Sequence, residues 1–130
     1  MEGPPRELLK TAVEASGNAY APYSRFRVGA AVRDDEGRIH AGVNVENSSL
    51  GLTMCAERVA VFSAVSRGAK RIVEVLVYAA DSESPIPPCG ACLQVIAELG
   101  GPDTIIHMVS KTVAYRAARL RDLLPSPFKL

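Results

Sequence analysis

The sequence has 130 residues, of which 48% are hydrophobic and 22% are charged; this size and composition fit one soluble folded domain spanning residues 1–130. Fifteen Lys and Arg are offset by fourteen Asp and Glu, so a nucleic-acid partner, which selects for a basic surface, is not expected. No run approaches the roughly 18 apolar residues of a membrane span, and the first residues lack the basic-then-apolar layout of a signal peptide, so we expect a cytoplasmic protein that does not bind membranes.

The first third of the chain predicts a helix followed by a β-hairpin. Apolar residues at helical spacing predict an amphipathic helix over residues 4–19, and a loop follows over 20–24. Two strand-like segments, 26–32 and 39–45, flank a turn rich in Asp and Gly at 34–37. The chain is therefore expected to begin with one helix and two paired strands.

The middle of the chain predicts two helices around one strand. Small residues over 48–53 form a loop that leads into a helix over 55–65, which is apolar over much of its surface and is therefore expected to be buried. Residues 72–80 form a nearly continuous apolar run, typical of a central strand that is covered on both faces. A proline-rich loop over 81–88 separates this strand from a second helix over 89–99.

The last part of the chain predicts two strands and a helical turn. The strands are expected over 104–109 and 113–115, and a helical turn over 119–124 precedes a tail that contains prolines. About five strands alternating with helices predict an α/β fold, in the form of a three-layer α/β/α sandwich around one mixed sheet.

All three cysteines lie in two short segments, residues 53–58 and 88–92. Cys89 and Cys92 have the C-x-x-C spacing, and Cys55 belongs to the earlier segment. Three converging thiolates would bind a soft or borderline divalent metal, with zinc as the preferred candidate, and would leave one coordination position open. An open position indicates a catalytic metal site, because water can occupy it.

Two charged residues follow the first cysteine. Glu57 lies two residues after Cys55, where a general acid and base that does not itself bind the metal is expected. Both cysteine segments lie at predicted helix starts, where the partial positive charge favours the thiolate. Three thiolates and a hydroxide outweigh the charge of Zn²⁺, and Arg58 is the candidate residue that offsets the excess. The alternative is an Arg58 side chain that faces solvent.

Three other interpretations of the cysteines stay open. The thiols could be buried small hydrophobic groups, or Cys89 and Cys92 could form a redox pair, although a redox pair does not account for Cys55 and Glu57. A fourth ligand from His107 would close the metal site and make it structural, as in a zinc-stabilised binding module.

Six motifs together resemble those of one enzyme family. In chain order they are Tyr20-Ala-Pro-Tyr-Ser24, Phe26-x-Val-Gly-Ala-Ala31, Asn44-Val-Glu-Asn47, Cys55-Ala-Glu-Arg58, Pro88-Cys-Gly-Ala-Cys92 and Leu123-Leu-Pro-x-x-Phe128. On these motifs the chain is similar to the cytidine deaminases of the short, single-domain type, which use three cysteine ligands and form homotetramers. The zinc motif alone indicates the deaminase superfamily, whereas Asn44, Glu46 and Phe128 indicate its nucleoside branch.

The resemblance implies a role for each remaining residue of the nucleoside site. Phe26 would pack on the pyrimidine, and the backbone around Ala56 would read the base. Asn44 and Glu46 would hydrogen-bond the ribose hydroxyls.

The tail residue Phe128 has two interpretations. It could anchor the chain end to its own core, or, as the family implies, it could reach the active site of a neighbouring subunit in a homotetramer. Leu50 stands where the family commonly has an aromatic residue, and this departure affects local packing and affinity rather than the reaction.

The reaction that the resemblance implies is zinc-dependent hydrolytic deamination, with one Zn²⁺ per subunit. Cytidine and deoxycytidine would yield uridine and deoxyuridine with release of ammonia, as a step of pyrimidine nucleoside salvage. Cys55, Cys89 and Cys92 would hold the metal, and Glu57 would transfer the protons. The alternative is a deaminase of a related base or of a nucleoside antibiotic with the same zinc site.

Overall fold

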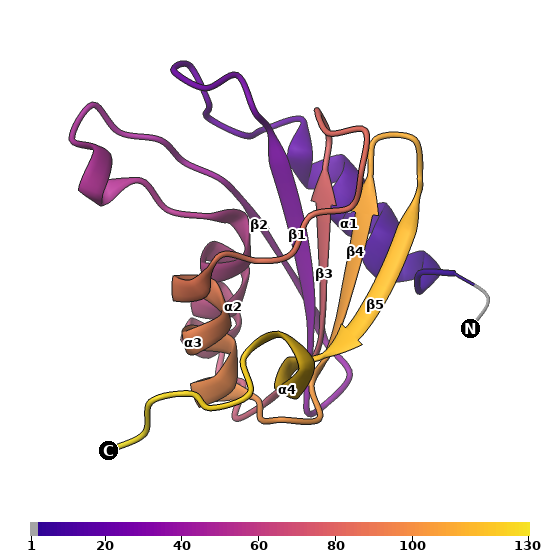
Figure 1. Cartoon of the computed structure of the whole chain (residues 1–130), viewed down its shortest axis with the longest axis vertical. Coiled ribbons are helices and arrows are strands. Elements are labelled where there is room, and N and C mark those ends of the chain that lie inside the picture. Colours follow the sequence, from indigo (N-terminus) through magenta and orange to yellow (C-terminus); the bar gives the residue numbers. More distant parts are fainter. Residues whose placement is uncertain (1–2) are drawn as a thin grey trace.

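The computed structural model describes residues 3–130 and contains a five-stranded sheet with the strand order β2-β1-β3-β4-β5 (Figure 1). The strands β3 and β4 are parallel, and the other neighbouring pairs are antiparallel, so the sheet is mixed. The strands are β1 (Val28–Asp34), β2 (Ile39–Val43), β3 (Ile72–Ala79), β4 (Ile105–Ser110) and β5 (Tyr115–Arg119). The helices are α1 (Arg6–Ser16), α2 (Ala56–Ser66), α3 (Gly90–Leu99), the short α4 (Leu120–Leu123) and a 3₁₀ turn, η1 (Leu50–Leu52).

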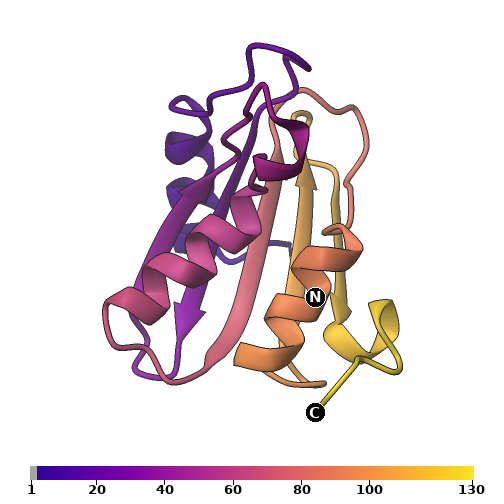
Figure 2. The ribbon, with the colours of Figure 1, turned by 90° about the vertical axis from the view of Figure 1, so that its left-hand side faces the viewer.

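Helices cover both faces of this sheet. Helix α1 packs against β1, β2 and β3 on one face, whereas α2 and α3 lie side by side on the other (Figure 1, Figure 2). This arrangement confirms the predicted three-layer α/β/α sandwich. Among the described residues, no helix combines the length and the hydropathy that a membrane span requires.

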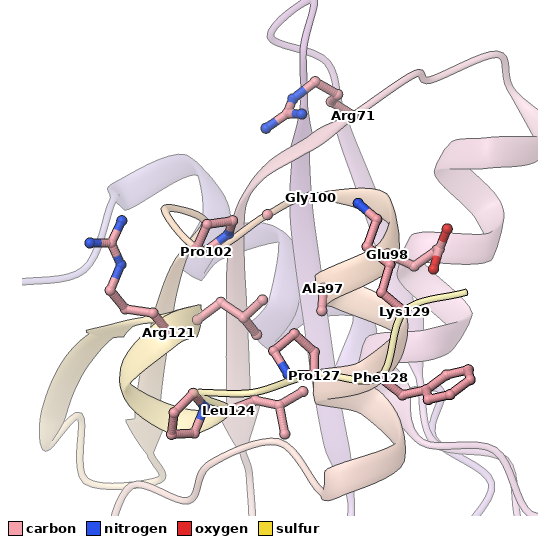
Figure 3. Close-up of a pocket in the computed structure, with 13 residues that line it drawn as sticks. Arg71, Ala97, Glu98, Gly100, Pro102, Arg121, Leu124, Pro127, Phe128 and Lys129 are labelled. Atoms are coloured by element: carbon pink, nitrogen blue, oxygen red, sulfur yellow. The ribbon is translucent and has the colours of Figure 1, made fainter.

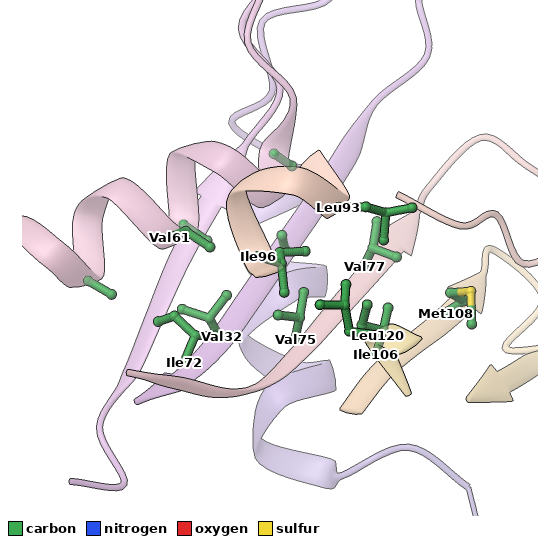
Figure 4. Packing of buried hydrophobic residues seen from close by; sticks show 14 of the residues in the cluster. Val32, Val61, Ile72, Val75, Val77, Leu93, Ile96, Ile106, Met108 and Leu120 are labelled. Atoms are coloured by element: carbon green, nitrogen blue, oxygen red, sulfur yellow. The ribbon is translucent and has the colours of Figure 1, made fainter. Parts of the chain in front are cut away.

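The larger hydrophobic core fills the space between the sheet and the pair α2 and α3 (Figure 4). A smaller core lies under α1 and contains Leu8, Ala12, Ala31, Leu76 and Val109. Strand β3 supplies Val75 and Val77 to the larger core and Leu76 to the smaller one. Because β3 is buried on both faces over most of its length, its sequence is a nearly continuous apolar run that only Glu74 interrupts, as predicted.

Two glycines allow helices to lie directly on the sheet. A Cβ atom at Gly42 would lie 2.4 Å from the carbonyl oxygen of Ala56, and a Cβ atom at Gly29 would lie 2.0 Å from that of Ala12. Any larger residue would therefore push α2 or α1 away from the sheet. Gly42 in this way fixes the position of the first turn of α2, which begins directly after Cys55.

The burial predicted for the helix over 55–65 is wrong in part. Helix α2 buries one stripe of its surface, but Phe62 is 46% exposed and Val65 is 44% exposed. The apolar residues of this helix lie all round its axis, and only those spaced three or four residues apart face the sheet. An apolar face of α2 is consequently uncovered in the single chain.

The strand predicted over 113–115 begins two residues later and extends further, over Tyr115–Arg119. Val113 belongs to the preceding turn, where its φ of 65° is in the left-handed region that strands do not use. Strand β5 is an edge strand with the sequence YRAAR and no fully buried residue. Its sequence therefore lacks the apolar alternation from which strands are predicted.

The other differences concern element ends and one short turn. The helix predicted over 4–19 spans only Arg6–Ser16, and the strand predicted over 39–45 ends at Val43. Beyond that end, Val45 forms isolated bridges with Tyr20 and Met54. The loop predicted over 48–53 contains the 3₁₀ turn η1. The small and polar residues of this segment do not predict such a turn.

Candidate active site

The three cysteines come together where two helices begin. Cys55 is the residue directly before α2, Cys89 is the residue directly before α3, and Cys92 lies in the first turn of α3. All three Sγ atoms lie within 4.8 Å of one another, with 3.8 Å between Cys55 and Cys89 and 3.5 Å between Cys89 and Cys92. These separations exceed the disulfide bond length of about 2.05 Å, and the thiols are free.

The thiol cluster fits a zinc ion. Tetrahedral sulfur ligands at about 2.3 Å from zinc are about 3.8 Å from one another, close to the spacing found here. The structure does not support His107 as a fourth ligand, because its two ring nitrogens lie 2.8 Å from the Tyr115 hydroxyl and 2.9 Å from the Glu74 carboxylate. Within residues 3–130 the cluster therefore offers three protein ligands and an open fourth position, as catalytic zinc sites do.

The surroundings of the cluster favour negative charge on sulfur. Arg58 places its Nη2 atom 3.5 Å from the Sγ atom of Cys55, in contrast to the alternative of a solvent-facing side chain. The hydrogen bond from Cys92, together with Arg58 and Cys89, lowers the pKa of Cys55 to about 5, against the opposing effect of burial. The same hydrogen bond and burial raise the pKa of Cys92. The nearby guanidinium of Arg58 therefore stabilises negative charge on the Cys55 sulfur.

Glu57 lies in the first turn of α2 and is only 5% exposed. Burial raises the pKa of Glu57 to about 7, and the negative charge of Cys55 acts in the same direction. A hydrogen bond to the backbone of Glu57 itself and the positive charge of Arg58 oppose this shift. A carboxyl group with a pKa near neutrality can both accept and return a proton.

A pocket of about 310 Å³ opens beside Glu57 and two of the thiols. Most of the residues predicted for a nucleoside site line this pocket. The complete lining is Ser24, Phe26, Val28, Asn44, Glu46, Thr53, Met54, Cys55, Ala56, Glu57, Ile86, Pro87 and Cys89. This volume is within the range of small-molecule sites. The fold thus brings residues from four separate segments of the chain to one cavity.

Asn44 is buried and uses its side chain to fix the start of β1. Its Oδ1 atom accepts a hydrogen bond from the Val28 N–H at 2.9 Å, and its Nδ2 atom donates one to the Phe26 carbonyl at 2.7 Å. One further hydrogen on Nδ2 and one lone pair on Oδ1 remain for a ligand. Phe26 is partly buried against the larger core and also lines the pocket. It is therefore both a core residue and a residue of the candidate site.

Comparison with known proteins agrees with this geometry. The family described as "cytidine and deoxycytidylate deaminase zinc-binding region" matches residues 4–108. The chain belongs to this family.

Individual relatives in this deaminase family match almost the whole chain. The cytidine deaminase of Halalkalibacterium halodurans is 46% identical over 121 residues, which are 93% of this chain and 91% of the relative. The cytidine deaminase of Mycobacterium tuberculosis is 46% identical over 124 residues, which are 95% of this chain and 88% of the relative.

Solved structures of the family have the same fold. The cytidine deaminase from Burkholderia pseudomallei superimposes with a TM-score of 0.90 at 42% identity, over 95% of this chain and 98% of that one. The enzyme from Mycobacterium tuberculosis gives a TM-score of 0.79 at 41% identity, over 96% and 97% of the two chains. The family resemblance inferred from the motifs, the α/β fold and the zinc-dependent deaminase chemistry are thereby confirmed.

Of the five residues predicted to contact the nucleoside, Phe128 alone lies outside the pocket. It lines a separate hollow of about 530 Å³ between α3, α4 and the C-terminal tail, which contains none of the thiols (Figure 3). Gln94 holds its backbone through two hydrogen bonds, of 2.9 Å to the carbonyl and 3.2 Å to the N–H. The ring projects away from Leu124 and is 71% exposed, so it does not anchor the tail in the core of its own chain.

Sequence reasoning missed Ser24 and Gln94 as residues of functional interest. In the sequence, Ser24 is part of a loop motif and Gln94 is part of a predicted helix. The contact of Ser24 with Glu46 spans 22 residues of the chain, and the contact of Gln94 with Phe128 spans 34. No local pattern could therefore have indicated these contacts.

Proposed function

We propose that this deaminase converts cytidine and deoxycytidine to uridine and deoxyuridine with release of ammonia, as a step of pyrimidine nucleoside salvage. The observation that carries the proposal is the cluster of three thiols with an open ligand position, next to buried Glu57 in a cavity of nucleoside size. The printed names of relatives at 46% identity support cytidine as the substrate.

Cys55, Cys89 and Cys92 hold one Zn²⁺ per subunit in the proposed mechanism. When bound, zinc supplies the Lewis acidity that brings the pKa of water towards about 7. Glu57 would accept one proton from this water while the water oxygen attacks C4 of the pyrimidine. The Glu57 carboxyl passes this proton to the ring nitrogen N3. It then takes the remaining proton from the new C4 hydroxyl and passes it to the departing amine, so that the C4–N bond breaks and ammonia leaves. Its burial suits these transfers, because it keeps the carboxyl near a neutral pKa. Arg58 offsets part of the negative charge of the thiolates.

The nucleoside lies between two walls of the pocket. Phe26 packs on the pyrimidine ring, and the backbone around Ala56 reads its polar edge. Asn44 and Glu46 hydrogen-bond the ribose hydroxyls, for which Asn44 retains one donor and one acceptor. Because a buried ribose needs such partners, the free base cytosine is a poor substrate.

The enzyme forms a homotetramer in which subunits share active sites. Two features of the single chain support this assembly: the uncovered apolar residues of α2, and the exposed ring of Phe128 on a fixed backbone. In the assembly, Phe128 covers the substrate base of a neighbouring subunit. The enzyme works in the cytoplasm, whose reducing conditions suit three free thiols.

A panel of substrates tests the proposal. Purified enzyme is incubated with cytidine, deoxycytidine, cytosine or single-stranded DNA, and ammonia release or the change in absorbance is followed. We expect turnover of the two nucleosides and very little of the other two compounds. Equal rates on the free base or on DNA would contradict the nucleoside assignment.

A further inference from the structure

The loop before β1 is hydrogen-bonded along its length to the segment that carries Glu46. The Tyr20 N–H donates to the Asn44 carbonyl at 3.0 Å, and the Glu46 N–H donates to the Tyr20 carbonyl at 2.8 Å. The Tyr23 and Ser24 N–H groups both donate to Oε1 of Glu46, at 3.0 and 3.2 Å. These two segments therefore form one wall of the substrate pocket.

The Ser24 hydroxyl is the centre of this wall. It donates a hydrogen bond to Oε2 of Glu46, and its oxygen accepts one from the Phe26 N–H at 3.0 Å. The Phe26 carbonyl is held at the same time by Asn44. One hydroxyl thus connects the carboxylate proposed for the ribose with the backbone of the aromatic residue proposed for the base.

The backbone between Ser24 and Phe26 has an unusual conformation. Arg25 has a φ of 57°, in the left-handed region that residues other than glycine rarely occupy. Its N–H donates to the Ala21 carbonyl at 2.9 Å, which closes the turn. In this turn the Phe26 N–H can reach back to the Ser24 oxygen, a contact between residues i and i+2 that serine side chains commonly form.

The hydrogen-bonding capacity of the two side chains limits what each can offer to a ligand. A hydroxyl has one hydrogen, and Ser24 gives it to Glu46, so Ser24 has no donor left for substrate. A carboxylate accepts about four hydrogen bonds, and Glu46 already accepts two at Oε1 and one at Oε2. One acceptor position therefore remains, and it lies on Oε2. The same contact with Ser24 is the main cause that lowers the pKa of Glu46.

We propose that Ser24 is a positioning residue for nucleoside recognition, which aims Oε2 of Glu46 at a single ribose hydroxyl and couples that contact to Phe26. This inference rests on the proposed function, in which Glu46 binds the ribose. Ser24 itself does not bind the substrate in this account. Its effect is to orient the carboxylate before the nucleoside arrives, so that binding does not have to order it.

The test compares Ser24→Ala with the parent enzyme on cytidine and on 2′,3′-dideoxycytidine, which lacks both ribose hydroxyls available to Glu46. For cytidine we expect KM to rise about tenfold, the size of losing one hydrogen bond to a charged group, with little change in kcat. For dideoxycytidine we expect a loss of kcat/KM at least about threefold smaller, because the hydroxyl that Glu46 would bind is missing. Equal losses on the two nucleosides would overturn the proposal.

Two further variants separate positioning from general damage. Ser24→Thr keeps the hydroxyl and should restore KM to within about twofold. Ser82 provides a matched control, since its hydroxyl also donates one hydrogen bond and accepts one, both with Ser84 in a loop outside the pocket. Ser82→Ala should leave KM for both nucleosides unchanged. The ratio of kcat/KM values on two substrates does not depend on the folded fraction of a preparation, so a less stable variant still gives an answer.

Glu46→Ala distinguishes failure of this inference from failure of the proposed function. If Glu46→Ala impairs cytidine more than dideoxycytidine but Ser24→Ala does not, the ribose assignment stands and the positioning role is wrong. If Glu46→Ala impairs both nucleosides equally, the ribose assignment itself is wrong.

Discussion

Glu57 has the environment that a proton carrier needs. It is almost fully buried, and the charge of the neighbouring Cys55 adds to the effect of burial on its pKa. We expect Glu57→Ala to keep its fold and its zinc while kcat falls by at least the roughly 10²–10⁴-fold typical of general acid and base catalysis. Steady-state kinetics together with metal analysis would measure this.

Glu57→Gln is the matched variant, because it keeps the shape of the side chain but cannot take up the proton. It should be impaired about as severely as Glu57→Ala. Near-normal turnover of either variant would show that another group transfers the protons.

Asp34 is a buried carboxylate at the end of β1, remote from the thiols. Burial alone would raise its pKa, but hydrogen bonds from His40, from the Glu36 and Arg38 N–H groups and from the Arg38 side chain hold it well below the usual value of 3.8. A folded-state pKa below the unfolded one stabilises the fold at every pH above about 4. This contribution is lost as the pH falls from there towards the folded-state pKa.

Asp34→Asn should therefore lower the free energy of unfolding at neutral pH by about 2–3 kcal/mol. It should also weaken the dependence of stability on pH below about 4. Asp103 offers a control, because its side chain is 71% exposed in its ion pairs with Arg119 and Arg121, and exposed ion pairs contribute little. Urea unfolding at several pH values would measure both variants. An Asp34→Asn variant as stable as the Asp103→Asn control would contradict the assignment.

Sequence patterns identified the catalytic residues better than they identified the residues that support them. Cys55, Glu57, Cys89 and Cys92 form two local motifs whose spacing follows from the chemistry of a metal site. Ser24 and Gln94 act through partners far away in the chain, and Asn44 uses its side chain for the backbone of β1. Such contacts depend on the register between segments, which one sequence does not encode in any local pattern.

At the scale of elements, apolar spacing predicts the order of helices and strands, but it does not predict the position of the edge strand β5. Strand β3 was predicted because both its faces are buried, but β5 has little apolar surface and a turn with an unusual residue before it. Val113 is β-branched and has a φ of 65° in that turn. A left-handed conformation costs an ordinary residue about 1–2 kcal/mol.

Replacing Val113 with asparagine tests this strain. Asparagine tolerates the left-handed conformation without the entropy loss of glycine, so Val113→Asn should raise the free energy of unfolding by about 0.5–1 kcal/mol. Val73 is also an exposed valine, 39% accessible, but it lies within β3, and Val73→Asn should destabilise because asparagine is a poor strand residue. Chemical denaturation of both variants gives the comparison. A loss of stability in Val113→Asn would count against strain at this turn.

At the scale of the whole molecule, the single chain leaves apolar side chains that the proposed tetramer would cover. Phe128 is the most informative of them, since its backbone is held by Gln94 while its ring is exposed. We expect Phe128→Ala to raise KM several-fold, in line with about 0.5–1.5 kcal/mol for an aromatic contact beyond area burial, with zinc content unchanged. Leu130→Ala, at the fully exposed chain end, should leave KM as it is.

Mixed tetramers test whether the ring serves a neighbouring subunit. Phe128→Ala chains combined with inactive Glu57→Ala chains pair intact tails with active pockets, so part of the affinity should return. Hybrids that form without any recovery, or a fully active monomer, would show that active sites are not shared.

In the function that we propose, three cysteines of this chain hold a catalytic zinc ion with an open coordination position. X-ray absorption at the zinc edge of the purified, active enzyme tests it most directly. We expect about one zinc per chain, with three sulfur ligands at about 2.3 Å and one lighter oxygen ligand. A first shell made of four protein ligands, or an active enzyme without zinc, would contradict it.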